Sequence, residues 1–516
     1  MNPLLDYSAF PRFSEIRPEH VTPAVDQLLA ENRALIKAIE ADPSAPSWQG
    51  FVEVLEEANE RISRAWGPVS HLNSVMNSPE LREAYNANLP KLTQYYAELS
   101  QNLYLFGKYK QLRASPEFDA MSTSRRKIVE NELRDFRLGG AELPDAQKAR
   151  FLVIQEELSG LSAKYEENLL DATNAFAVYV THAAELSGIP DDALEAARGE
   201  AEKDGKPGWK FTLRMPSYLP VMQYADNRAL REQMYRAYST RASELSPASP
   251  SEDGAKPDWD NTPLIGSILK LRREAAQMLG FANYAEESLA AKMAETPQQV
   301  LDFLNRLAVR AKPYAENDIA ELRRFAQDSL GMDAMEPWDI AYVSEKLRVA
   351  RYAFSDNEVK QYFPENVVLP GMFKLVETLY GLNIEVATAP VWHPDVKFFR
   401  VAEQGGDTVG YFYLDLYARE NKRGGAWMDD AIGRCRKGDK IQAPAAYLTC
   451  NFSAPLNGKP ALFTHDEVIT LFHEFGHGLH HLLTRIEDLG VSGINGVEWD
   501  AVELPSQFME NFCWEW

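Results

Sequence analysis

Residues 464–482, THDEVITLFHEFGHGLHHL, constrain the fold of this chain more than any other stretch. Thr464 is followed three residues later by Glu467, the spacing of a capping box that satisfies free N–H groups at a helix start. The residues that follow include apolar side chains at helical spacing, namely Val468, Ile469, Leu471 and Phe472. The stretch therefore predicts an amphipathic helix that begins next to Thr464.

Two histidines on this predicted helix have the spacing of a metal site. His473 and His477 are four residues apart, so both imidazoles leave the same helix face about one turn apart. Glu474 lies next to the first histidine, where its carboxylate can reach a water on the metal without being a ligand. Five of the nine histidines of the chain fall in residues 465–481. The pattern indicates a zinc site rather than an incidental motif on a solvated helix face.

The third metal ligand has to follow this helix, because a catalytic zinc takes three protein ligands and leaves one position for water. His480 and His481 are expected to be structural, since a fourth protein ligand would close the site. Glu487 is expected in the turn that ends the helix, and Glu503 opens a second apolar segment. The residues alone leave several acidic candidates open: Glu487, Glu498, Asp500, Glu503, Glu510 and Glu515.

The length of 516 residues exceeds the usual size of one hydrophobic core, so we expect two or more lobes. We divide the chain into an N-terminal helical region, residues 1–200, and a metallopeptidase region, residues 201–516. The second region is expected to be helical to about residue 380 and to hold a small sheet and the zinc-binding helices in 381–516. Amphipathic helical runs in the first region cover residues 48–78, 80–113, 125–137 and 147–178.

A β-rich part precedes the metal helix and follows Gly381, an expected helix stop. Alternating patterns predict strands at residues 390–401, 408–417 and 445–452. Residues 446–452 either offer an open edge to an extended peptide or form a fully paired interior strand. Gly424 and Gly425 fit either a mobile part of a channel mouth or a hairpin turn.

Residues 246–254 are predicted to form a loop, because serine, proline and glycine dominate them. Three aspartates in or near this loop lack the spacing of an EF-hand calcium site, so we expect them to be solvated. They are Asp253, Asp258 and Asp260.

The formal charge of −22 disfavours nucleic acid and anionic membranes as partners. The sequence starts without a basic, apolar leader and contains no run of about 18 apolar residues, which predicts a cytoplasmic protein. Its three cysteines, Cys435, Cys450 and Cys513, are widely spaced and fit reduced thiols better than a disulfide framework.

Several long stretches of the chain resemble the thimet-type oligopeptidases. They are FSEIRPEH at 13–20, FYLDLYARE at 412–420, AYLTCNF at 446–452, FTHDEVITLFHEFGH at 463–477 and DAVELPSQ at 500–507. The resemblance implies a mainly α, two-lobed, zincin-like metallopeptidase with a deep channel and a small β-sheet next to the HExxH helix. Such a channel admits short peptides and excludes folded proteins.

The resemblance also implies that Glu503 is the third ligand, so that one zinc ion per chain is held by His473, His477 and Glu503. Pro505 then places Glu503 near the first turn of its helix, because proline cannot sit deep in a helix. We expect a zinc endopeptidase with Glu474 as general base, acting on short oligopeptides such as cleaved signal peptides and proteolysis products. A monomer is expected.

Two acidic residues near Glu503 are candidates to orient the ligating imidazoles from behind. They are Asp500 and Glu510. The alternative for each is a helix cap or a solvated carboxylate.

The chain departs from the family at its end. Family members continue well past the stretch that ends here at Trp516, and that further part carries a histidine and tyrosines implied in substrate binding. The alternative to a working enzyme is therefore a catalytically impaired fragment that binds zinc and peptides. A third hypothesis is a helical scaffold in which the HExxH motif is incidental. The positions of Glu474 and Glu503, which match those of the family, disfavour this hypothesis.

Overall fold

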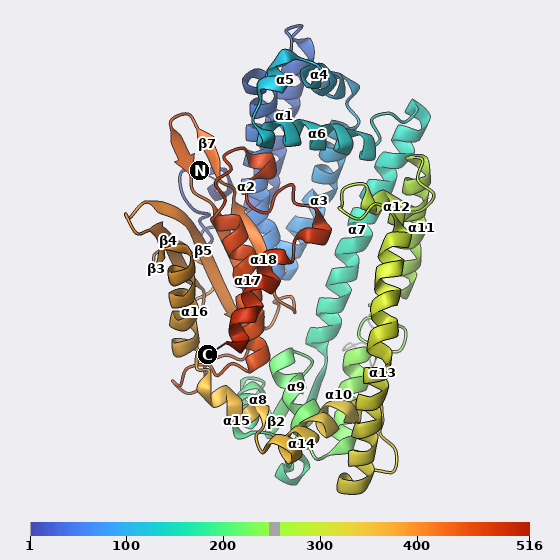
Figure 1. The fold of residues 1–516 in the computed structure, drawn as a ribbon, viewed down its shortest axis with the longest axis vertical. Helices are drawn as coiled ribbons and strands as arrows, with labels where there is room; N and C mark the ends of the chain where they lie inside the picture. The colour runs from blue at the N-terminus through green and yellow to red at the C-terminus, as the bar shows by residue number, and fades with distance from the viewer. Residues whose placement is uncertain (1, 247–258, 516) are drawn as a thin grey trace.

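The computed structural model describes residues 2–246 and 259–515, and most of these residues lie in helices, which confirms the mainly α fold class. Figure 1 shows two columns side by side: a sheet with α16, α17 and α18 on the left, and the long helices α7, α11 and α13 on the right. The N-terminal helices lie at the top and α8, α9, α10 and α14 at the bottom. In the described residues every helix is too short or too polar to cross a membrane.

The N-terminal region is helical, as predicted. Ser78 caps α3 by accepting a hydrogen bond from the N–H of Leu81, and Pro79 occupies the first turn. Asn102 caps a new helix with its side chain, so the single run predicted at 80–113 is two helices. The helices are α1 (Val21–Ala41), α2 (Glu53–Val75), α3 (Pro79–Ser100), α4 (Leu103–Arg113), α5 (Pro116–Ala120), α6 (Thr123–Leu138) and α7 (Asp145–Ala175).

The middle of the chain contains a small antiparallel pair that the sequence analysis did not predict, β1 (Ala177–Val180) with β2 (Trp209–Thr212). Most of the predicted 246–254 loop, with Asp253 and Asp258, lies outside the described residues. Asp260 is partly exposed, and its Oδ1 also accepts the N–H of Thr262 at 2.9 Å. The helices here are α8 (Asp191–Lys203), α9 (Met215–Tyr224), α10 (Arg228–Ser239), α11 (Thr262–Met278), α12 (Tyr284–Leu289), α13 (Pro297–Leu330), α14 (Ile340–Tyr352), α15 (Asp356–Val359) and α16 (Glu365–Tyr380).

A five-stranded sheet follows α16, which ends at Gly381 in the left-handed conformation, as expected of a helix stop. Its strand order is β3-β4-β5-β9-β6. A separate hairpin, β7 (Cys435–Lys437) with β8 (Lys440–Gln442), follows β6. The five strands are β3 (Leu382–Val386), β4 (Lys397–Glu403), β5 (Thr408–Tyr417), β6 (Trp427–Ile432) and β9 (Ala445–Phe452).

Strand β9 is an interior strand, which excludes the open edge considered for residues 446–452. It pairs in parallel with β5 and antiparallel with β6. Gly424 and Gly425 do not form a hairpin turn either, because the strands they connect lie on opposite sides of β9. The outer strand on this side of the sheet is β6.

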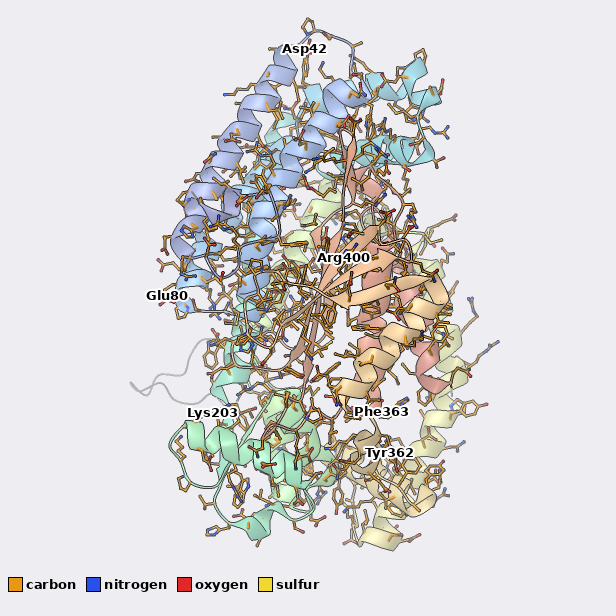
Figure 2. All side chains as sticks on the ribbon, turned by 90° about the vertical axis from the view of Figure 1, so that its left-hand side faces the viewer. Asp42, Glu80, Lys203, Tyr362, Phe363 and Arg400 are labelled. Atoms are coloured by element: carbon orange, nitrogen blue, oxygen red, sulfur yellow. The ribbon has the colours of Figure 1, made fainter. Side chains whose placement is uncertain are left out.

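Two hydrophobic cores hold the sheet in place. On one face, Val376 of α16 and Phe475 of the metal helix pack with Leu414 of β5. On the other face, Leu28 of α1 and Tyr413 of β5 belong to one buried cluster. Figure 2 shows this layering from the side, with the blue N-terminal helices on one side of the sheet, where Arg400 marks β4, and α16 in front.

Candidate metal centre

The predicted metal helix is present as α17, His465–Leu482. Thr464 Oγ1 accepts the N–H of Glu467 at 3.2 Å, and Glu467 Oε2 accepts the N–H of Thr464 at 2.8 Å. Both halves of the capping box are therefore formed. Because this cap determines where the helix begins, it also determines the face from which the two histidines project.

His473, His477 and Glu503 converge. The imidazole centroids are 4.9 Å apart, and Glu503 Oε2 lies 3.1 Å from the Nε2 atom of each histidine. One ligand atom from each residue lies within 4.8 Å of the others. Within the described residues no other cluster of histidine, cysteine, aspartate or glutamate has such spacing.

Glu503 is the N-cap residue of α18, Leu504–Glu510, and Pro505 lies in the first turn of this helix, as the sequence predicts. The helix packs closely against α17. A Cβ atom on Gly476 would lie 2.6 Å from both the carbonyl oxygen of Pro505 and the Cα of Ser506. Only a glycine between the two histidines allows this approach, and the sequence analysis did not recognise that role.

Ser506 is a second residue that the sequence analysis missed. Its buried hydroxyl lies 2.8 Å from Glu503 Oε2 and 2.9 Å from the Glu503 carbonyl oxygen. A donor at this place orients the carboxylate toward the histidines. The spacing of Ser506 three residues after Glu503 could have indicated this contact, because residues three apart are neighbours on a helix.

Of the two acidic candidates for orienting the imidazoles, only Glu510 does so. Its Oε1 lies 2.7 Å from His473 Nδ1. With the proton on Nδ1, this bond leaves the Nε2 lone pair directed toward Glu503. Asp500 instead accepts the backbone N–H groups of Met293 and Ala294, so the expectation that it contacts an imidazole is wrong.

Two further acidic candidates for the third ligand are engaged elsewhere. Glu487 pairs with Arg436 at 2.7 Å, and Glu498 pairs with Lys127 at 2.9 Å. Neither Glu487 nor Glu498 belongs to the convergent group. His481 is structural, as expected, with Nε2 at 3.0 Å from the carbonyl oxygen of Ile432.

Glu474 is suited to exchange a proton. Its side chain is buried, and its Oε2 has no hydrogen-bond partner among the described residues. Burial raises the pKa of Glu474 to about 7, while His473 opposes and Glu503 adds to this rise. A carboxyl group with a pKa near neutrality can both accept and release a proton at physiological pH.

The donor set fits zinc. Two imidazole nitrogens and one carboxylate oxygen are the ligands of a catalytic site that keeps a place for water. Burial lowers the pKa of His477, which favours the neutral imidazole that a metal requires. The unpartnered Glu474 Oε2 matches the need for a proton acceptor beside such a water.

Two family models match the chain. The model described as Peptidase family M3 matches residues 221–516. The model of the neurolysin and thimet oligopeptidase N-terminal domain matches residues 25–148.

Curated proteins match the whole chain. Oligopeptidase A of Salmonella typhimurium and that of Escherichia coli are each 53% identical over 516 residues, which is 100% of this chain and 75% of each relative. Among solved structures, one titled PZ peptidase A with inhibitor 2 superposes with a TM-score of 0.53 at 15% identity. The match covers 98% of this chain and 70% of the other, and it shows a shared fold.

Proposed function

Because the chain belongs to peptidase family M3, we propose that His473, His477 and Glu503 hold a catalytic zinc ion, with Glu474 as the general base. The observation that carries this assignment is the single oxygen, Glu503 Oε2, at 3.1 Å from the Nε2 atoms of both histidines. The protein is a zinc metallopeptidase of the oligopeptidase A type that degrades short peptides.

Each residue of the site has a separate task. Zinc, when bound, polarises the peptide carbonyl and activates a water. Glu474 takes the proton of the attacking water on Oε2 and then gives it to the departing amine, a cycle that its pKa of about 7 favours. Glu510 holds His473 through Nδ1, and Ser506 holds the Glu503 carboxylate.

The peptide lies along β6 rather than along β9. As the outer strand, β6 can extend the sheet by pairing with an extended chain, which binds peptides with little dependence on their side chains. This strand lies beside α17. The carbonyl oxygen of Ile432, at the end of β6, lies within hydrogen-bond distance of His481 Nε2. Met428 of β6 pairs with Leu448 of β9, whose side chain lies next to Gly478 of α17. Cleaved signal peptides and proteolysis products are suitable substrates, which a deep channel between two lobes would select by size.

The remaining assignments concern the whole chain. We divide it into an N-terminal helical region, residues 1–200, and a metallopeptidase region, residues 201–516, which the separate family matches support. A cytoplasmic monomer without nucleic-acid or membrane partners is consistent with the charge of −22 and with three free thiols.

Cleavage of a short quenched fluorescent peptide, with and without a chelator, tests the proposal. We expect cleavage that the chelator abolishes and added zinc restores. A protein that binds zinc and the peptide but never cleaves it would be a binding protein, and this result would refute the proposed catalytic roles.

A further inference from the structure

The segment that leads to Glu503 is held from two different parts of the fold. Lys127 of α6 donates to Glu498 at 2.9 Å. Asp500 lies two residues further on and accepts backbone N–H groups from the connector between α12 and α13. Figure 1 shows this segment, in red, reaching from α17 toward the yellow-green loop to the left of the α12 label.

Both carboxylate oxygens of Asp500 take part in this contact. The N–H of Met293 lies 2.9 Å from Oδ1 and 3.1 Å from Oδ2, and the N–H of Ala294 lies 2.9 Å from Oδ2. These backbone N–H groups hold the pKa of Asp500 below its usual value, which keeps the carboxylate ionised. Hydrogen bonds to an ionised acceptor are stronger than those between neutral groups.

The position of Glu503 depends on contacts of the segment before it as well as on Ser506 and on the packing of α18 against α17. Its side chain is 52% exposed, so burial does not fix it. The preceding 3₁₀ turn, Trp499–Ala501, contains Asp500 and ends two residues before Glu503. The ion pair of Lys127 with Glu498 is a single half-exposed contact and contributes little. Asp500 is exposed too, but both of its oxygens accept backbone N–H groups, those of Met293 and Ala294.

We propose that Asp500 is a positioning residue for the metal site, which couples zinc binding at Glu503 to the contact with the α12–α13 connector. This inference rests on the proposed zinc ligands. Loss of the contact frees the segment before Glu503, so the third ligand spends less time at the histidines and zinc binds more weakly. The coupling is reciprocal, so zinc in turn stabilises the hydrogen bonds at Met293 and Ala294.

The first test measures zinc affinity by competition with a chromophoric chelator, on the full chain. Asp500→Ala removes all three hydrogen bonds and should weaken zinc binding by about two- to thirty-fold, the range for residues that affect a site without contacting it. Asp500→Asn keeps one carbonyl oxygen and should give a smaller loss. Asp260→Ala is the matched control, because Asp260 also accepts a backbone N–H but lies at the start of α11.

The second test needs no variant. Hydrogen exchange of the Met293 and Ala294 amides should slow when zinc is added to the unaltered protein, while exchange at Thr262 should not change. Equal exchange with and without zinc, or an Asp500→Ala protein that binds zinc as tightly as the unaltered one, would refute the positioning role alone. Failure of the unaltered protein to bind zinc would refute both this role and the proposed metal site.

Discussion

The backbone of Pro505 lies so close to Gly476 that a Cβ atom on this glycine would be 2.6 Å from the Pro505 carbonyl oxygen. Gly476 stands between His473 and His477, the two proposed zinc ligands on α17, and Pro505 follows Glu503 by two residues. The contact brings the first turn of α18 against the middle of α17. Glu503 can therefore reach the two histidines because Gly476 lacks a side chain.

Gly476→Ala should push α18 away from α17. Overpacking a tight contact costs about 1–3 kcal/mol, which corresponds to roughly 5- to 150-fold in affinity if it falls on the metal site. We expect weaker zinc binding, measured by chelator competition. Gly478→Ala is the matched control, because its Cβ would meet the flexible Leu448 side chain at 3.1 Å. Equal zinc affinity in the two variants would contradict the argument.

Glu474→Gln should retain zinc and lose turnover. The amide keeps the size of the side chain but cannot take the proton from water, so kcat should fall by about a hundred- to ten-thousand-fold. Zinc content by atomic emission and cleavage of the quenched peptide give the two measurements. Loss of zinc from this variant would show that Glu474 is a ligand.

Glu503→Gln should weaken zinc binding and turnover together, since a charged ligand is replaced by a neutral one. His477→Ala should have the same effect, whereas the unaltered protein should hold about one zinc ion per chain. Chelator competition on all three proteins measures this. Full zinc retention in both variants would reject the His473, His477 and Glu503 site.

The stability of the fold should depend on pH through Glu56 of α2. Burial raises its pKa to about 8, although its Oε1 accepts the N–H of Gly490 at 3.0 Å. Because the folded-state pKa is raised, the contribution of this group is fully present below about pH 4.5 and is lost as the pH rises through about 8. The loss has an upper limit of about 1.4 kcal/mol per pH unit.

Glu56→Gln mimics the protonated acid, so its stability advantage over the unaltered protein should grow between pH 4.5 and 8. Urea unfolding at several pH values measures the difference. Glu57→Gln, at an exposed position of the same helix, should show no such trend. A constant difference for Glu56→Gln across this pH range would exclude the raised pKa.

Local patterns in the sequence were sufficient for the metal helix. The capping box at Thr464 and Glu467 acts over three residues, and His473 and His477 share a face because they are four residues apart. The choice of Glu503 came from the family resemblance, because several acidic residues downstream satisfied the same local rules. Glu474 was predicted as the general base from a local pattern too, because it directly follows His473 in the sequence.

The different roles of Glu510 and Asp500 could not be predicted from the sequence, because Glu510 contacts His473 while Asp500 contacts the connector after α12. The place of β9 in the sheet could not be predicted either, because its apolar residues suit both an edge strand and an interior strand. The structure places it between β5 and β6. Gly476 acts by letting α18 pack closely against α17. Ser506 acts through its hydrogen bond to the Glu503 carboxylate, which this packing brings near the histidines. Features that depend on neighbouring residues could therefore be predicted from the sequence. Contacts between distant segments could not, because side-chain partners across helices and strands follow from three-dimensional packing and not from spacing along the chain.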